Sequence, residues 1–134
     1  MNDTLNDGDL IFMEKITQRF GELDRYDIII FDSNLNQQDF IKRIIGLPGE
    51  TVRIDKSGNI YINEQLIEEN YGKEIMIYPG IAEEGVTLGE KEYFVLGDNR
   101  NNSEDSRFAE LGPINYYQIK GKVCFSIIPF GKIE

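Results

Sequence analysis

The sequence contains no histidine and only one cysteine, Cys124, among its 134 residues. Without histidine, neither a Ser-His-Asp nor a Cys-His catalytic arrangement can form, and most zinc sites are excluded as well. A single cysteine cannot make an internal disulfide, so cysteine usage does not reveal the redox compartment. No apolar run reaches the roughly 18 residues that a membrane-spanning helix needs, and no signal-peptide pattern opens the chain.

Positive charge is also scarce, since 14 Lys and Arg against 24 Asp and Glu give a formal net charge of −10. This charge argues against a nucleic-acid partner, because phosphate binding needs clustered Lys and Arg. It also argues against attraction to an anionic membrane surface, while an apolar contact with lipid stays open. The length, with 40% hydrophobic and 28% charged residues, is typical of one globular domain with its own core.

Apolar residues are arranged for β-structure almost throughout the chain. Residues 51–55 and 59–63 alternate apolar and polar side chains around a Lys-Ser-Gly turn, which predicts a hairpin. The acidic segment 64–92 is interrupted by Gly and Pro and predicts one or two short strands within long loops. A helical turn is compatible with residues 115–119. The predicted fold class is all-β, with further strands at 10–13, 27–31, 40–45, 92–96 and 122–128.

Two cations, Lys42 and Arg43, stand in the middle of the apolar run at residues 39–50 (DFIKRIIGLPGE). On an ordinary strand both point to solvent, in keeping with the rarity of buried charges. If the apolar neighbours are buried, both cations must instead lie at the edge of a core. There, lost hydration lowers the pKa of Lys42, and a neutral lysine amine can act as a general base.

A very polar stretch at residues 97–107 (GDNRNNSEDSR) directly follows the predicted strand 92–96. Its composition fits either a solvated surface turn or a buried hydrogen-bonding network. For the network, Asp105 and Arg107 have the side chains needed to clamp Arg43. The hydroxyl of Ser103 could then hold the Lys42 amine, because a neutral amine needs partners to be oriented.

Residues 40–49 and 97–107 resemble the two most diagnostic motifs of the bacterial type I signal peptidases, in the order that the family has them. Thr4 and Leu5, followed by Asp7-Gly8-Asp9, resemble the end of the motif around that family's nucleophile and the start of the next one. Residues 123–130 resemble the closing strand. The resemblance covers essentially the whole soluble domain of a small Gram-positive member.

The resemblance implies a mostly antiparallel β scaffold with long loops that carries a Ser/Lys dyad hydrolase, with neither cofactor nor metal. Such enzymes cut signal peptides from secreted preproteins at the outer face of the cytoplasmic membrane. An N-terminal helix anchors them there, so the expected location is the cell membrane with the catalytic domain on the extracytoplasmic face. Residues 1–134 then form a single catalytic domain.

The resemblance also assigns roles to individual residues. Lys42 is the general base that takes the proton of the nucleophilic serine, and Ser103 orients the Lys42 amine. We expect Lys42 to be largely desolvated, with a hydroxyl as partner and no carboxylate in contact, because a carboxylate would raise the pKa. The supporting ion-pair network consists of Arg43, Asp98, Asp105 and Arg107.

The substrate groove implied by the resemblance selects small residues, such as alanine, at the first and third positions before the cleaved bond. Phe40 and Ile41 line this groove, and Leu5 sits near them. The backbone from Asp39 to Lys42 would pair with an extended substrate and so add a strand to the sheet.

Two departures from the family pattern stand at the N-terminus. The family motif reads Ser-Met-x-Pro-Thr-Leu, so its serine would fall directly before Met1, and Asp3 replaces the proline. We therefore expect the 134 residues to be a piece of a longer protein. This piece lacks the nucleophile and the membrane anchor and is inactive by itself. Some divergent relatives have lost both dyad residues and act as non-catalytic assembly factors for pilins, which is the alternative function. The retained Lys42 favours an enzyme.

Overall fold

The structure is a computed structural model, and it describes residues 9–17, 22–35, 37–68 and 78–129. Within these ranges the chain forms ten strands and three short 3-10 helices. No helix in this part of the chain is long and apolar enough to cross a membrane. The strands are β1 (Asp9–Thr17), β2 (Ile28–Asp32), β3 (Asp39–Gly46), β4 (Thr51–Ile54), β5 (Ile60–Ile62), β6 (Gln65–Ile67), β7 (Val86–Thr87), β8 (Glu92–Leu96), β9 (Ile114–Asn115) and β10 (Ile119–Pro129), and the helices are η1 (Gly80–Glu83), η2 (Arg100–Asn102) and η3 (Tyr116–Gln118).

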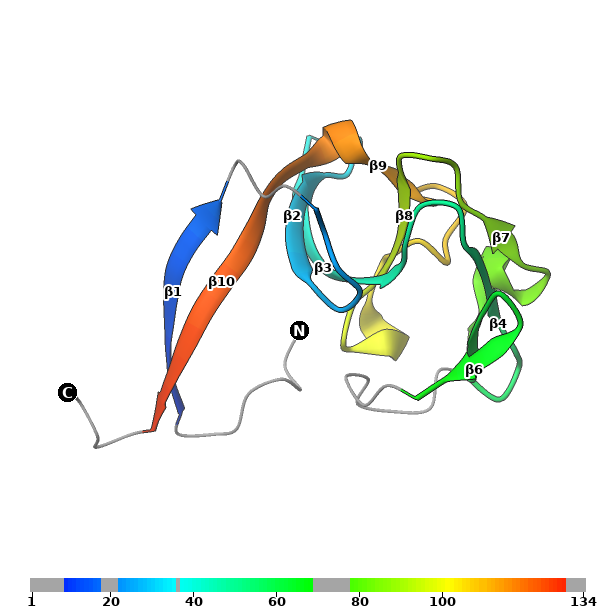
Figure 1. The fold of residues 1–134 in the computed structure, drawn as a ribbon, viewed down its shortest axis with the longest axis horizontal. Helices are drawn as coiled ribbons and strands as arrows, with labels where there is room; N and C mark the ends of the chain where they lie inside the picture. The colour runs from blue at the N-terminus through cyan, green and yellow to red at the C-terminus, as the bar shows by residue number, and fades with distance from the viewer. Residues whose placement is uncertain (1–8, 18–21, 36, 69–77, 130–134) are drawn as a thin grey trace.

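The strands form two sheets, and every strand pair is antiparallel. The larger sheet has the order β1-β10-β2-β3-β8-β9, and the smaller has the order β6-β5-β4-β7. In Figure 1, β1 and the adjoining length of β10 extend as a ribbon on one side, while β2, β3 and β8 curve toward the smaller sheet. The predicted all-β, mostly antiparallel fold is therefore confirmed.

Most predicted elements are present with small shifts of their ends. The predicted helical turn at 115–119 is η3, and the acidic segment 64–92 holds the two short strands β6 and β7. The hairpin turn at residues 56–58 joins β4 to β5, with Gly58 at a φ of 87°. Strand β9 was not predicted, because two residues are too few to show a period.

Strand β3 alternates its side chains between two apolar clusters, as the two-residue period of a strand requires. Ile45 belongs to the cluster that packs the two sheets together, with Val52, Ile54 and Phe94 among its members. Ile44, on the opposite face, belongs to a second cluster with residues of β2, β8, β9 and the start of β10. Each fully buried aliphatic side chain of this kind stabilises the fold by about 1.5–3 kcal/mol.

One edge of β3 is paired along only half its length. Strand β2 pairs with β3 from Asp39 to Arg43, whereas β8 pairs with the other edge only between Arg43 and Gly46. Within the described residues, no strand occupies that second edge beside Asp39–Lys42. The first half of β3 therefore has one edge without a strand partner among the described residues, next to the Lys42 side chain.

We predict that Gly46→Ala lowers the free energy of unfolding by about 1–3 kcal/mol, because the site has no room for a methyl group. A Cβ there would lie 2.5 Å from Val52 Cγ2, 2.9 Å from Leu88 Cδ1 and 3.0 Å from Phe94 Cβ. Urea unfolding followed by circular dichroism measures the loss. Gly89→Ala is the control, because the atoms nearest to its Cβ, at 3.2–3.6 Å, belong to the Glu92 side chain. Equal stability of the two variants would contradict the prediction.

Candidate active site

Strand β3 and the polar loop after β8 bring Lys42 and Ser103 together. Lys42 Nζ donates a hydrogen bond of 2.8 Å to Ser103 Oγ, although the two residues are 61 positions apart. Both side chains are half-buried. Among the described residues, no carboxylate forms an ion pair with Lys42. The predicted hydroxyl partner is thus confirmed, whereas the amine is half-buried and not fully removed from water.

Burial is the largest influence on the Lys42 amine and lowers its pKa. The negative charges of Asp105 and Glu104 oppose this shift, and that of Asp98 does so more weakly. The positive charge of Arg107 acts in the same direction as burial. The net result is a lowered pKa, which is the predicted direction and increases the fraction of neutral amine near neutral pH.

Gly97 lies so close to the Lys42–Ser103 pair that only glycine fits. A Cβ at this position would lie 2.0 Å from Ser103 Oγ and 3.3 Å from Lys42 Nζ. Any other residue would therefore push the Ser103 hydroxyl away from the amine. The sequence gives Gly97 as the first residue of the polar stretch, but no local pattern shows that its backbone supports the amine and hydroxyl.

Arg43 forms a buried, bidentate ion pair with Asp98. Arg43 Nε and one terminal nitrogen donate to the two Asp98 carboxylate oxygens at 3.0 and 2.9 Å. The Asp98 side chain is completely buried and that of Arg43 is 5% exposed. Arg43 also donates to the Tyr26 carbonyl oxygen at 3.0 Å. The pair joins β3 to the start of the polar loop.

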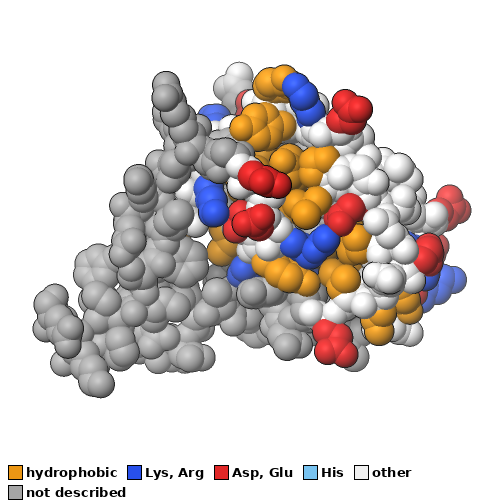
Figure 2. Space-filling model, viewed as in Figure 1, with side chains coloured by type: hydrophobic (Ala, Val, Ile, Leu, Met, Phe, Trp, Pro, Cys, Tyr) orange, Lys and Arg blue, Asp and Glu red, His pale blue; other side chains and the backbone are white. Residues whose placement is uncertain are grey.

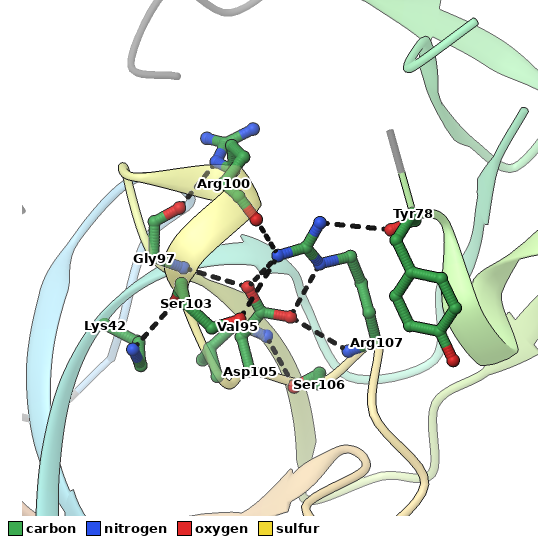
Figure 3. Close-up of polar contacts among 9 residues, drawn as sticks. All are labelled: Lys42, Tyr78, Val95, Gly97, Arg100, Ser103, Asp105, Ser106 and Arg107. Atoms are coloured by element: carbon green, nitrogen blue, oxygen red, sulfur yellow. Dashed lines mark hydrogen bonds and ion pairs between the residues drawn. The ribbon is translucent and has the colours of Figure 1, made fainter. Parts of the chain in front are cut away.

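Arg107 ties the far end of the same loop together (Figure 3). Its guanidinium donates to both oxygens of Asp105, at 2.8 and 2.9 Å. Further donations reach the carbonyl oxygens of Tyr78 at 3.0 Å and of Arg100. Arg107 is 1% exposed, so these bonds replace the water that the buried guanidinium has lost. The polar stretch is therefore a buried network and not a solvated turn.

The predicted clamp of Arg43 by Asp105 and Arg107 differs from the observed ion pairs. Arg43 pairs with Leu96 across the β3–β8 ladder, which brings Asp98, two residues further on, to its guanidinium. Asp105 is engaged locally, because its carboxylate also accepts from the backbone N–H groups of Arg107 and Gly97. The four charges therefore form two separate ion pairs, which composition alone does not distinguish.

A hollow of about 370 Å³ opens beside the amine. Its walls include Phe40 and Ile41 from β3 and Asn99, Asn102 and Ser103 from the loop. Ile41 is 51% exposed, so an apolar surface faces solvent next to Lys42. Phe40 and Ile41, which were predicted to line a substrate groove, both line this hollow.

Two further residues were predicted to bind substrate. Asp39, whose backbone was expected to pair with the substrate, lies on the part of β3 that β8 does not reach, and its side chain pairs with Lys120 at 2.9 Å. Leu5 lies outside the described residues, as do Met1 and Asp3.

Sequence reasoning also missed two contributors to the loop. Arg100 is buried, and its Nε donates to the Gly97 carbonyl oxygen at 2.7 Å. Ser106 Oγ accepts the Val95 N–H at 2.9 Å, which gives the buried hydroxyl a hydrogen-bond partner. The one sequence feature that could have indicated these two roles is that both residues belong to a dense run of polar residues after a buried strand.

The described residues include no group of three or more Cys, Asp or Glu side chains that could hold a metal ion. The fold and the site together define an all-β protein with a lysine-centred candidate active site.

Comparisons with known proteins identify the family. The family model "Signal peptidase, peptidase S26" matches residues 1–128. Signal peptidase I of Bacillus licheniformis is 37% identical over 141 residues, which cover 100% of this chain and 75% of that protein. Signal peptidase I T of Bacillus subtilis (strain 168) is 38% identical over 141 residues, with 100% and 72% covered.

A solved structure agrees with these relatives. The crystal structure of a signal peptidase I from Enterococcus faecalis V583 matches with a TM-score of 0.63 and 35% identity. The match covers 78% of this chain and 98% of that one. The chain therefore belongs to the signal peptidase family S26, whose members are peptidases that remove signal peptides, and the resemblance seen in the two motifs is confirmed.

We predict that Asp98→Ala lowers the free energy of unfolding by about 3–5 kcal/mol, because it leaves the buried Arg43 guanidinium without its carboxylate. Glu83→Ala is the control, since its ion pair with Lys56 is exposed and 3.8 Å long. We expect the control to change stability by less than about 1 kcal/mol. Urea unfolding measures both, and a similar small loss in Asp98→Ala would refute the importance of the buried pair.

We predict that Glu104→Gln lowers the pKa of Lys42 further, because the Glu104 carboxylate favours the protonated amine. The pH dependence of Lys42 acetylation by traces of acetic anhydride, read by mass spectrometry, measures the shift, since only a neutral amine reacts. The midpoint should move to lower pH in Glu104→Gln. Glu84→Gln, which removes an equal charge elsewhere, should leave it in place. An unchanged or raised midpoint in Glu104→Gln would disprove the assignment.

Proposed function

We propose that the chain is the catalytic domain of a membrane-anchored serine endopeptidase that removes signal peptides from secreted preproteins. The observation that carries the proposal is the 2.8 Å hydrogen bond from the half-buried Lys42 amine to Ser103 Oγ. A lysine with a lowered pKa can serve as general base without histidine, which this chain does not contain.

In the proposed reaction, Lys42 takes the proton from a serine hydroxyl as the serine oxygen attacks the carbonyl carbon of the scissile bond. The Lys42 ammonium then gives that proton to the leaving amine as the peptide bond breaks. Water hydrolyses the resulting ester, again with Lys42 as base. Ser103 keeps the amine oriented through both steps, and the two ion pairs hold the loop that carries Ser103.

The free edge of β3 beside Asp39–Lys42 supports an extended substrate bound as an added strand. Such pairing places the substrate backbone next to the Lys42 amine. Phe40 and Ile41 supply an apolar surface for side chains near the cleaved bond. We propose small residues at the first and third positions before that bond, as the family resemblance implies.

The nucleophile in this proposal is a serine directly before Met1, as the family motif implies. The 134 residues by themselves are then inactive. An N-terminal helix upstream of that serine would anchor the protein in the cell membrane, with the catalytic domain on the extracytoplasmic face.

A second candidate is a non-catalytic assembly factor for pilins on the same fold. Asp3 favours it, because this residue stands where the family motif has proline. Proline would fix the backbone after the nucleophile, and aspartate does not. The residue before Met1 separates the two functions, since a serine there gives the dyad and any other residue does not.

To test the proposal, the chain is extended with an anchor and a serine directly before Met1 and incubated with a preprotein in detergent micelles. We expect cleavage after a small residue. Lys42→Ala should reduce kcat/KM by at least about 100-fold, because it removes the general base. Lys56→Ala, at an exposed lysine, should retain full activity. Mass spectrometry of the products measures both the rate and the cleaved bond.

Two outcomes would count against this function. Cleavage that survives Lys42→Ala would exclude the dyad, and cleavage by the unextended 134-residue chain would exclude a nucleophile before Met1. Absence of cleavage in the extended chain would favour the assembly factor.

A further inference from the structure

A second hollow adjoins the one beside Lys42. It has a volume of about 430 Å³, and Gln38, Phe40 and Glu104 line both hollows. Because Phe40 lies two residues before Lys42 on β3, the second hollow is within reach of the same bound polypeptide. An extended chain advances about 3.3 Å per residue, so only a few residues separate the hollows.

The second hollow combines an apolar lining with two carboxylates. Leu35, Phe40, Phe108 and Leu111 are half-buried and supply apolar surface, and we call the site the acidic pocket because Glu104 and Glu110 also line it. Both glutamates are exposed. Neither forms an ion pair with another described residue, and no Lys or Arg of the described part of the chain lines the hollow.

The wall of the acidic pocket is built by the turn that follows Arg107. The backbone N–H of Phe108 donates to the Asp105 carbonyl oxygen at 3.1 Å, and Leu111 and Gly112 donate to the Phe108 carbonyl oxygen at 3.1 and 2.8 Å. The Phe108 ring packs against Tyr78 with centroids 5.1 Å apart. The wall is therefore attached to the same buried Asp105–Arg107 pair that supports Ser103.

These features match one type of side chain. Lysine and arginine place their aliphatic stems on apolar surface while the charged end stays near water and carboxylates. An apolar side chain would leave the two glutamates unused, and an acidic one would be repelled by them. The chain's net charge of −10 adds a general attraction for cations, and the acidic pocket adjoins the hollow that Lys42 lines.

We propose that the acidic pocket is a subsite that receives a lysine or arginine side chain of the substrate. This residue lies within a few positions of the substrate bond that is cleaved beside the Lys42 amine. The inference rests on the proposed function, because it assumes a polypeptide bound along β3. The proposed function already includes a preference for small residues next to the cleaved bond. The acidic pocket adds a preference for a positively charged side chain at another substrate position.

The test uses the extended chain and a set of substrate peptides that carry Lys, Gln or Glu at one position at a time, from four residues before to four residues after the cleaved bond. Each trio competes in one reaction, so the product ratio gives the ratio of kcat/KM. We expect one position at which Lys exceeds Gln by about twofold to fivefold, the range typical of exposed ion pairs, with Glu below Gln.

Glu110→Gln removes a pocket carboxylate that plays no part in the proposed chemistry, and it should abolish most of the preference for Lys. Glu84→Gln removes an equal exposed charge away from the pocket and should leave the preference intact. If the preference persists in Glu110→Gln, or no position discriminates Lys from Gln, the acidic pocket is not a subsite although the peptidase function stands.

A binding measurement separates failure of the subsite from failure of the proposed function. The Lys peptide that discriminates best, or the whole Lys set if nothing is cleaved, is added to the 15N-labelled 134-residue chain. We expect amide shifts at residues 108–111 that are larger with Lys than with Gln peptides and are lost in Glu110→Gln. Shifts that do not depend on Glu110 would overturn the subsite, whereas absent cleavage with Glu110-dependent shifts would contradict only the peptidase function.

Discussion

Partial removal of water from the Lys42 amine is the constraint on which the rest of the site depends. A lysine on an exposed strand would stay protonated near neutral pH and could not accept a proton. Position 42 avoids this because it precedes the point where β8 joins β3, so its amine lies beside the loop that follows β8. Ser103 then supplies a hydroxyl that orients the amine without the charge that would restore its pKa.

The two buried ion pairs hold the polar loop so that the Ser103 hydroxyl lies beside the Lys42 amine. Arg43–Asp98 ties the beginning of the loop to the strand that carries Lys42, and Arg107–Asp105 ties its end to residues near η1. Buried ion pairs add little net stability, because the cost of desolvating the charges offsets their attraction. Their directional hydrogen bonds, however, fix one geometry of the loop. We therefore attribute to them the position of Ser103 more than the stability of the fold.

The sequence was sufficient to predict the strands that carry the site. Residues 92–96 include the aromatic Tyr93 and Phe94 and the β-branched Val95, and their predicted strand has the bounds of β8. The contact of Lys42 with Ser103 followed from two motifs, since no periodicity links residues 61 positions apart. The prediction of Asp105 as the partner of Arg43 was wrong. The polar loop contains three acidic residues, and its composition does not show which of them pairs with Arg43. The register between β3 and β8 selects Asp98. The acidic pocket was not predicted, because Leu35, Phe108 and Leu111 meet only in the folded chain.

The most direct test of this account is the NMR titration of the Lys42 side chain, with the lysine ε carbons labelled with 13C. Partial removal from water requires Lys42 to lose its proton at lower pH than a lysine side chain that is free in solution. A midpoint for Lys42 clearly below that of a free-lysine standard in the same buffer is the predicted result. A midpoint equal to or above that of the standard would contradict the proposal that this amine is the general base.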